Sequence, residues 1–260
     1  MKKILLSIAG FDPSSGAGLV LDLKVFQKLN FHGMGILTSL TVQNTKDVKK
    51  VHCISSDIIW NQYKALQEDV SFSGVKVGML GCKSNIQVVN KILSENKDIP
   101  KVVDPVFKSS SGTWLLEKEA IHRCITKISG KASLLTPNRE EANLISGIKI
   151  KNAEDMKEAA KQIFSLTNIP CLIKGFNIKS IVIDVLFDGK KFHQFENKKI
   201  KKKVHGTGCF LSSSILSFMA KGNSLEESCS LASKLTYQAM SKAIQLGQGQ
   251  QIISFFLEED

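Results

Sequence analysis

Short apolar runs alternate along the chain with longer segments in which apolar residues recur every three or four positions. The short runs have the length of buried strands, and the longer segments have the period of amphipathic helices. The pattern predicts strands at 3–9, 35–42, 48–54, 74–79, 101–104, 133–135, 171–174, 181–187 and 191–196. It predicts helices at 17–29, 55–70, 86–93, 116–128, 139–145, 152–166, 207–221 and 225–246.

Turn and cap residues support these boundaries. Ser224 and Glu227 have the spacing of a capping box, and Asp188-Gly189 indicates a hairpin between the last two strands. The alternation continues without a linker or a repeat. It predicts one α/β domain over residues 1–260, a three-layer α/β/α fold with a mostly parallel central sheet. Ligands of such sheets bind at the carboxyl ends of the strands, where the motifs described below are expected to lie.

Composition and the N-terminus favour a cytoplasmic protein. Hydrophobic residues make up 43% of the 260 residues and charged residues 23%, which is ordinary for a soluble domain. No apolar run reaches the roughly 18 residues that span a bilayer, so no membrane association is expected. The N-terminal apolar stretch covers only 4–9 before Asp12-Pro13, which indicates a buried strand rather than a signal peptide.

Cysteine spacing gives no sign of a metal site or of a redox motif. The six cysteines stand at positions 53, 82, 124, 171, 209 and 229, with no C-x-x-C pair and no zinc spacing among them. Most are expected to be small buried hydrophobic residues in a reducing compartment. Only Cys209 has neighbours that suggest chemistry.

The formal net charge of +11 comes almost entirely from lysine, since Arg123 and Arg139 are the only arginines. Nucleic-acid readers usually rely on clustered arginine, so no nucleic-acid partner is expected. The lysines are scattered apart from those in 198–203. A solvated surface is the favoured explanation, and a positive field that attracts anionic substrates is the alternative.

The segment 206-GTGC-209 lies at the start of the helix predicted at 207–221. Glycines let a ligand approach the backbone, and the N–H groups at a helix start bind phosphate. A thiol at the same place has its thiolate favoured by the helix dipole, so Cys209 could accept a proton from a hydroxyl. A glycine turn followed by a core cysteine is the alternative. The chain has neither a P-loop nor a dinucleotide-binding fingerprint, so another phosphate site is required.

Several motifs in order along the chain carry a family resemblance. They are 10-GFDPSSGAG-18, Asp22-Leu23-Lys24, 42-VQNT-45, 75-VKVGML-80, 104-DPV-106, 135-LTPNREEA-142, 173-IKG-175, 184-DVLFDG-189 and 205-HGTGC-209. Together they resemble the hydroxymethylpyrimidine/phosphomethylpyrimidine kinases of the ribokinase-like superfamily, which act in thiamine biosynthesis. Each motif alone is weak, and their combination over nearly the whole chain is specific.

The resemblance implies roles for individual residues. Cys209 matches the catalytic base, and Gly206, Thr207 and Gly208 match the anion hole. Gln43 matches the glutamine that pairs with the aminopyrimidine, inside a pocket that corresponds to Gly10, Asp22, Val42 and Met79. Lys174, Asn138 and Asp104 match positions near the nucleotide phosphates, and Glu141 with Asn138 matches a magnesium motif. From the residues alone, Gln43 reads as a loop glutamine, and Asn138 with Glu141 as a capping box.

Two segments depart from the family pattern. In 104-DPVFKSSSG-112, Lys108 comes early and Ser110 stands where the family often has lysine, so Lys108 is not assigned that role. Lys203-Val204 replaces the small polar residues that usually precede HGTGC. The sequence therefore does not predict the structure of the segment that leads into the anion hole.

The resemblance implies an ATP- and Mg²⁺-dependent kinase for 4-amino-5-hydroxymethyl-2-methylpyrimidine and its monophosphate. It also implies a homodimer, the commonest symmetric assembly. One alternative is a pyridoxal kinase of the same fold, and Gln43 favours the pyrimidine. Another is a non-catalytic pyrimidine sensor, against which Cys209, Asn138 and Glu141 argue.

Overall fold

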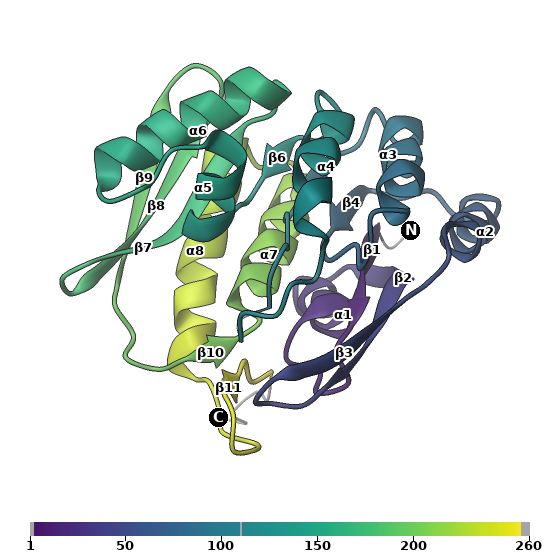
Figure 1. Cartoon of the computed structure of the whole chain (residues 1–260), viewed down its shortest axis with the longest axis horizontal. Helices are drawn as coiled ribbons and strands as arrows, with labels where there is room; N and C mark the ends of the chain where they lie inside the picture. The colour runs from purple at the N-terminus through teal and green to yellow at the C-terminus, as the bar shows by residue number, and fades with distance from the viewer. Residues whose placement is uncertain (1–2, 110, 256–260) are drawn as a thin grey trace.

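The computed structural model describes residues 3–109 and 111–255 (Figure 1). One large sheet has the strand order β3-β2-β1-β4-β5-β6-β7-β8-β9. The strands of this sheet are β1 (Ile4–Phe11), β2 (His32–Gln43), β3 (Val48–Cys53), β4 (Gly74–Val77), β5 (Lys101–Val103), β6 (Leu134–Leu135), β7 (Cys171–Ile178), β8 (Ile181–Phe187) and β9 (Phe192–Lys198). A second, two-stranded sheet pairs β10 (Val204–His205) with β11 (Gln251–Ile252).

The central strands of the large sheet are parallel. Pairings β2–β1, β1–β4, β4–β5, β5–β6 and β6–β7 all run in the same direction. The edges are antiparallel, with β3 on β2 at one side and the β8–β9 hairpin on β7 at the other. The mostly parallel sheet predicted from the sequence is confirmed.

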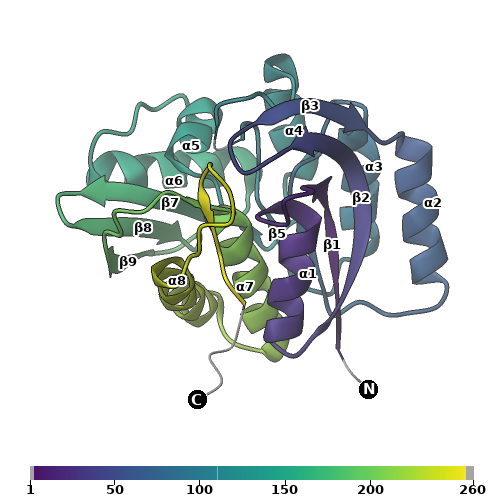
Figure 2. The same ribbon diagram turned by 90° about the horizontal axis from the view of Figure 1, so that it is seen from below.

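Helices cover both faces of this sheet. They are α1 (Gly18–Lys28), α2 (Ser56–Gln67), α3 (Asn85–Glu95), α4 (Ile121–Ile128), α5 (Arg139–Ser146), α6 (Ala153–Thr167), α7 (Thr207–Lys221) and α8 (Leu225–Ser241), with a 3₁₀ turn at Lys118–Ala120. Figure 2 shows α1, α7 and α8 on one side of the sheet and α3 to α6 on the other. The three-layer architecture is therefore also confirmed.

Side chains alternate between the two faces of the central strands and so contribute to the hydrophobic cluster on each face of the sheet. Leu6 and Ile8 of β1 pack in the cluster with α3 and α4, and Leu5 packs in the cluster with α7. All four residues of β4 are buried. Period-two alternation places polar Ser7 and Lys76 on the α1/α7 side, where a buried polar network can satisfy them.

Some boundaries differ from the prediction. The last long helix ends at Ser241 and not at 246, because the chain turns there and Ile244 bonds to Ile252 in both directions. The helix expected at 116–128 is shorter and begins with the 3₁₀ turn. The capping box at Ser224 and Glu227 is confirmed.

One expectation about the cysteines was wrong. Cys53 at the end of β3 and Cys82 in the loop after β4 form a disulfide, with Cα atoms 6.1 Å apart. Cys124, Cys171 and Cys229 are buried, as expected. The sequence separation of 29 residues gave no signal, because the end of β3 and the β4–α3 loop become neighbours only in the folded sheet.

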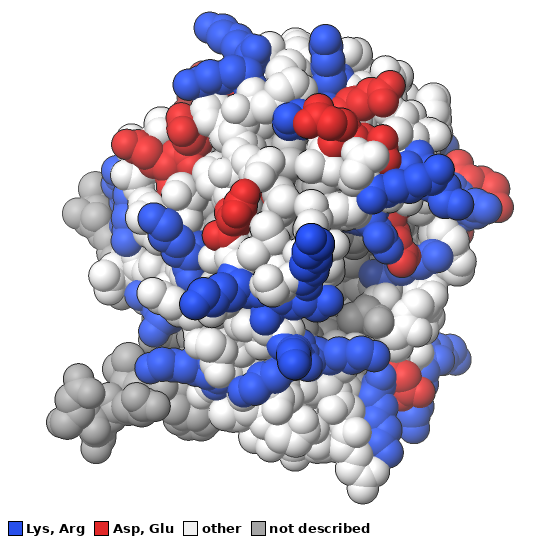
Figure 3. Space-filling model, turned by 90° about the vertical axis from the view of Figure 1, so that its left-hand side faces the viewer, with Lys and Arg blue, Asp and Glu red and all other residues white. Residues whose placement is uncertain are grey.

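Among the described residues, no helix is both long enough and apolar enough to span a bilayer. On the face seen in Figure 3, lysine and arginine side chains are spread over the surface with acidic side chains among them. This distribution fits the favoured explanation of the net charge, a solvated lysine-rich surface.

Candidate active site

The parallel strands deliver polar residues to one cavity of about 970 Å³ at their carboxyl ends. It brings together most of the residues singled out in the sequence, namely Gly10, Gln43, Met79, Asp104, Asn138, Glu141, Lys174, Gly206, Thr207, Gly208 and Cys209. Asp22 and Val42 do not line it. Basic and acidic side chains line the cavity in similar number, so a strongly positive pocket is not what attracts a ligand.

The segment 206–208, called the anion loop below, is held by close backbone packing. Gly206 has φ 80° and ψ 5°, a left-handed conformation that glycine adopts without strain. A Cβ at Gly206 would overlap the carbonyl oxygen of Gly16, so this position accepts glycine alone. The first α7 N–H that bonds back to Gly206 is that of Phe210. The N–H groups of residues 207–209 precede it and have no partner within the helix, which is the arrangement that suits an anion at a helix start.

A lysine–aspartate pair adjoins this loop. Lys174 Nζ lies 2.5 Å from Asp104 Oδ1, which also accepts a hydrogen bond of 3.2 Å from Thr136. A Cβ on Gly208 would lie 3.1 Å from Lys174 Nζ, so glycine lets the ammonium approach the helix start. Burial alone would lower the pKa of Lys174, but the carboxylates of Asp104 and Glu141 raise it, so the side chain stays charged.

Asn138 and Glu141 form the capping box of α5. Asn138 Oδ1 accepts from Glu141 N at 3.0 Å, and Glu141 Oε2 accepts from Asn138 N at 2.8 Å. The capping interpretation is therefore confirmed, while the cavity position leaves room for a second role. Burial, with a further contribution from the Asp104 charge, raises the pKa of Glu141 to about 8 against the effect of Lys174.

The residues at this corner fit a magnesium ion. Two nearly buried acidic side chains, Asp104 and Glu141, face one lysine, and burial favours the protonated form of Glu141 at neutral pH. A cation bound beside Glu141 would favour its carboxylate form. Magnesium takes hard oxygen ligands and needs only one or two carboxylates, since water and phosphate complete its shell. A complete protein cage is neither required nor present among the described residues.

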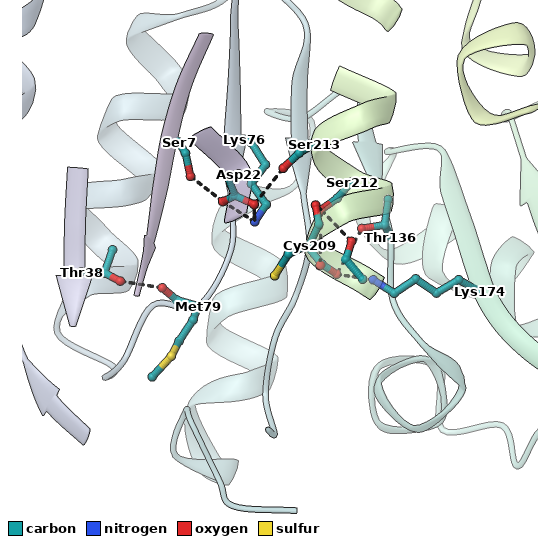
Figure 4. A network of polar contacts seen from close by, with 12 residues as sticks. Ser7, Asp22, Thr38, Lys76, Met79, Thr136, Lys174, Cys209, Ser212 and Ser213 are labelled. Carbon is teal, nitrogen blue, oxygen red and sulfur yellow. Dashed lines mark hydrogen bonds and ion pairs between the residues drawn. The ribbon is translucent and has the colours of Figure 1, made fainter. Parts of the chain in front are cut away.

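Cys209 lies between two ion pairs. Figure 4 shows it between the Asp22–Lys76 pair on one side and Lys174 on the other. Burial raises the pKa of the Cys209 thiol to about 11, although the Lys76 charge and a hydrogen bond from the Gly18 N–H lower it. The sequence predicted a thiolate favoured by the helix start. In the structure, burial outweighs the Lys76 charge and the Gly18 bond, so the resting group is the thiol, although part of the side chain stays exposed to the cavity.

Asp22 is a buried ion-pair partner behind the cavity wall. Both of its oxygens lie within 2.9 Å of Lys76 Nζ, and Ser7 and Ser213 donate to it at 2.6 and 2.8 Å. The Asp22 charge outweighs burial and raises the pKa of Lys76. Lys76, and not Asp22, reaches the cavity surface. Val42, with 49% of its side chain exposed, faces away from it.

Gln43 is linked to the opposite wall of the cavity. Its amide nitrogen lies 3.1 Å from His205 Nε2, which lies 3.0 Å from Asp12 Oδ2. Asp12 also accepts from the backbone N–H groups of Ser14 and Ala17. Burial would raise the pKa of Asp12, but the bonds from His205 and Ser14 lower it, so Asp12 is ionised.

The two departures from the family pattern now have places in the structure. Lys108 Nζ lies over the Trp114 ring at 4.3 Å, and Ser110 lies outside the described residues. Val204 pairs with Gln251, and the Gln251 N–H bonds to Lys203 O. The C-terminal strand thus fixes the segment before the anion loop, which the sequence left open.

Sequence reasoning missed Lys76, His205 and Asp184 as cavity residues. Lys76 offered a signal, since it is charged and stands between buried valines of an apolar strand. Asp184 accepts from the Gly175 N–H at 2.7 Å and so holds the turn after Lys174. Asp184 opens the motif 184-DVLFDG-189, but its partner lies across the β7–β8 hairpin, so the motif alone assigned it no role.

The site combines a glycine-rich helix start with a lysine and a thiol, at the carboxyl edge of an α/β/α sheet. This combination defines a class of protein. It is that of small-molecule kinases with a ribokinase-like fold. Within this class, the model of the phosphomethylpyrimidine kinase family matches residues 12–254, and the chain belongs to that family.

Known relatives agree in sequence and in structure. The hydroxymethylpyrimidine/phosphomethylpyrimidine kinase of Aquifex aeolicus is 39% identical over 97% of this chain and 100% of its own. The phosphomethylpyrimidine kinase structure from Clostridium difficile has a TM-score of 0.80 and 35% identity, over 92% of this chain and 100% of its own. A Bacillus subtilis pyridoxal kinase structure in complex with ADP has a TM-score of 0.88 and 30% identity, over 98% and 97%.

Proposed function

We propose that this kinase transfers the γ-phosphate of ATP to 4-amino-5-hydroxymethyl-2-methylpyrimidine and then to its monophosphate, as a step of thiamine biosynthesis. One observation carries the proposal. A single cavity holds an amide suited to an aminopyrimidine, an anion loop at a helix start, and a thiol next to that loop.

The pyrimidine would lie against Gln43, Met79 and Gly10. An amide offers a donor and an acceptor side by side, as the edge of a neutral aminopyrimidine requires. A Cβ at Gly10 would lie 2.8 Å from Ser39 Oγ and 2.9 Å from Met79 Sδ. Glycine there keeps the methionine side chain in place beside the ring position.

The phosphates would lie between Lys174 and the start of α7. The N–H groups of residues 207–209 present a fixed positive end, and the Lys174 ammonium reaches the same point. These groups stabilise the charge on the transferred phosphoryl oxygens without reorganising, which is the main source of catalysis in phosphoryl transfer.

Glu141 and Asn138, with Asp104 nearby, would hold Mg²⁺ through water and phosphate oxygens. The ion neutralises phosphate charge when it is bound. Glu141 is already oriented by its bond to Asn138 N, so the carboxylate is in place before any ligand arrives.

Cys209 accepts the proton of the primary alcohol in the first step. Because its resting form is the thiol, the cysteine must first lose its own proton to water, and the thiolate then takes the proton of the alcohol and becomes a thiol again. Lys76 and the Gly18 N–H stabilise the thiolate once it forms. In the second step the acceptor is an anionic phosphate, which needs no base, and charge neutralisation dominates.

Pyridoxal phosphorylation is the second candidate activity. The Bacillus subtilis pyridoxal kinase matches this chain over 98% of its length at a TM-score of 0.88. Gln43 and its bond to His205 favour the aminopyrimidine, because pyridoxal has no adjacent amino group and ring nitrogen with which to pair.

The wider setting follows from the same proposal. We propose a cytoplasmic homodimer that uses ATP and Mg²⁺ and has no nucleic-acid or membrane partner. The dispersed lysines support the absence of a nucleic-acid partner, and two-fold assemblies are the commonest oligomers. The Cys53–Cys82 disulfide is the one feature that a reducing compartment would alter.

An ATP-consumption assay tests this function. Purified protein with ATP and Mg²⁺ is given the pyrimidine alcohol, its monophosphate or pyridoxal in parallel. We expect turnover with both pyrimidines and a lower kcat/KM for pyridoxal. Turnover with pyridoxal alone would move the protein to the second candidate, and no turnover with any of them would contradict the proposal.

A further inference from the structure

His205 belongs to the HGTGC motif, yet the proposed chemistry leaves it without a task. Its Nε2 lies 3.0 Å from Asp12 Oδ2 and 3.1 Å from the amide nitrogen of Gln43. It thus joins the loop after β1 to the end of β2, directly before the anion loop. The side chain is mostly buried and lines the cavity.

Hydrogen-bond chemistry fixes the proton on Nε2. The Asp12 carboxylate is ionised, and an ionised carboxylate only accepts hydrogen bonds. The His205 Nε2 must therefore donate to Asp12. A protonated ring nitrogen has no lone pair, so it cannot accept from the NH₂ group of Gln43.

The other end of the amide shows the same conflict. Thr41 Oγ1 has one proton and donates it to Phe11 O at 2.9 Å. The same hydroxyl lies 3.2 Å from the Gln43 amide oxygen, where it would need that proton again. The two ends of an amide have nearly equal shape, so exchanging them keeps every distance. Thr41 Oγ1 then accepts from the amide nitrogen, and the single Nε2 proton of His205 is shared between Asp12 Oδ2 and the amide oxygen in a three-centre bond.

We propose that His205 is a positioning residue that turns the Gln43 amide so that its oxygen faces His205 and its nitrogen faces Thr41. The Nε2 proton that His205 gives to Asp12 is then shared with the amide oxygen, and the amide nitrogen donates to the Thr41 hydroxyl. One lone pair and one N–H remain, side by side, on the free edge of the amide. They are the acceptor and the donor for the substrate.

The orientation of the amide matters because it sets the orientation of the substrate. The amide oxygen, on the His205 side, would accept from the 4-amino group, and the amide nitrogen would donate to the adjacent ring nitrogen. The 5-hydroxymethyl group is next to the 4-amino group and so lies toward His205. The chain continues from His205 into the anion loop and Cys209. A reversed amide would reverse the ring and turn the alcohol away from that loop.

This inference rests on the proposed function, and binding of paired ligands tests it. Calorimetry measures the Kd of the pyrimidine alcohol and of the analogue that lacks the 4-amino group. Their ratio reports what the Gln43 amide contributes. In His205→Leu we expect the preference for the amino compound to fall by about tenfold, within the discrimination of one bidentate pair.

Two further variants separate positioning from folding. His205→Gln places an amide donor near the Nε2 position and should restore most of the preference. His205→Asn is too short to reach and should resemble His205→Leu. In a Gln43→Ala background, His205→Leu should leave the ratio unchanged, since the group it orients is gone.

The outcomes are distinct. An unchanged ratio in His205→Leu and His205→Asn, with wild-type melting temperature, would overturn the positioning role. An equal fall in the Gln43→Ala background would also overturn it, because His205 would then act without the amide. Failure of the wild-type protein to bind the pyrimidine alcohol would instead overturn the proposed function.

Discussion

At the residue scale, the least expected property of the site is the resting state of Cys209. Burial among apolar residues and carboxylates keeps the proton on sulfur and raises the pKa to about 11. A base that rests in its protonated form limits the alcohol step and has no effect on the phosphate step. The two steps should therefore respond differently to changes at this residue.

Replacing Cys209 tests that difference. Cys209→Ala should lower alcohol phosphorylation by about 10²–10⁴-fold, the usual contribution of a general base. Phosphorylation of the monophosphate should fall much less. Cys209→Ser keeps a polar atom, but its hydroxyl loses a proton only far above neutral pH, so it should behave like the alanine variant. The ratio of the two activities is measured in variants that melt at the wild-type temperature. Small and equal losses would make Cys209 a packing residue.

The same group predicts a pH dependence. The raised pKa means that the thiolate fraction is small at neutral pH and grows with pH until about 11. The kcat/KM for the alcohol should then rise by about tenfold per pH unit between pH 7 and 9, while that for the monophosphate changes little. A pH profile of both reactions in one buffer series provides the measurement. An alcohol profile that is flat over this range would exclude the thiolate as the base.

Asp22 gives a third prediction at this scale. It is fully buried and paired with Lys76, so Asp22→Asn leaves a buried ammonium without its counter-charge. We expect the free energy of unfolding to fall by about 3–5 kcal/mol, as when one partner of a buried pair is removed. The KM for the pyrimidine should change little, because Asp22 does not line the cavity. A large rise in KM at unchanged stability would show that Asp22 contributes to substrate binding.

At the element scale, the disulfide ties the end of β3 to the loop that follows β4. That loop contains Met79, and Thr38 of β2 donates to Met79 O at 2.6 Å. The bond between Cys53 and Cys82 therefore restrains the loop after β4, and Met79 of the same loop lines the cavity.

Reduction of this disulfide should lower stability without removing activity. A closed loop of about this length contributes about 3–4 kcal/mol in the chain-entropy model, so the reduced protein should melt at a lower temperature. Thiol titration of the denatured, unreduced protein should find four free cysteines, namely Cys124, Cys171, Cys209 and Cys229. Cys53→Ser serves as the control, since reductant should not lower its melting temperature further. Six free thiols without reductant would contradict the bond.

At the scale of the whole molecule, the sequence predicted the layers and the parallel sheet because apolar periodicity records which faces are buried. Ser224 and Glu227 marked the start of α8, because a capping box is a local pattern. Motif resemblance placed Gln43, Lys174 and Cys209 in one site, and the cavity contains all three.

What escaped prediction depends on contacts between distant segments. The Asp22–Lys76 pair joins α1 to β4, and the disulfide joins β3 to the loop after β4. The pairing of Val204 with Gln251 brings the C-terminal segment to the anion loop. The pKa of Cys209 was mispredicted because local sequence shows the helix start and does not show how deeply the thiol is buried.

The assembly state is a further prediction for the whole molecule. A homodimer should sediment at micromolar concentration as a species of twice the 28.6 kDa chain. The fraction of this species should grow with protein concentration if the association is reversible. A single species of 28.6 kDa over the whole range would show a monomer.

The central claim is that this cavity selects the aminopyrimidine alcohol for phosphorylation. A direct competition measures it: equal concentrations of the pyrimidine alcohol and pyridoxal are incubated with the protein, ATP and Mg²⁺, and both phosphorylated products are quantified by mass spectrometry. The early product ratio equals the ratio of the two kcat/KM values, so binding and chemistry are compared in one reaction. The account predicts that pyrimidine monophosphate forms first and in excess and then gives way to the diphosphate. Predominant formation of pyridoxal phosphate would contradict it.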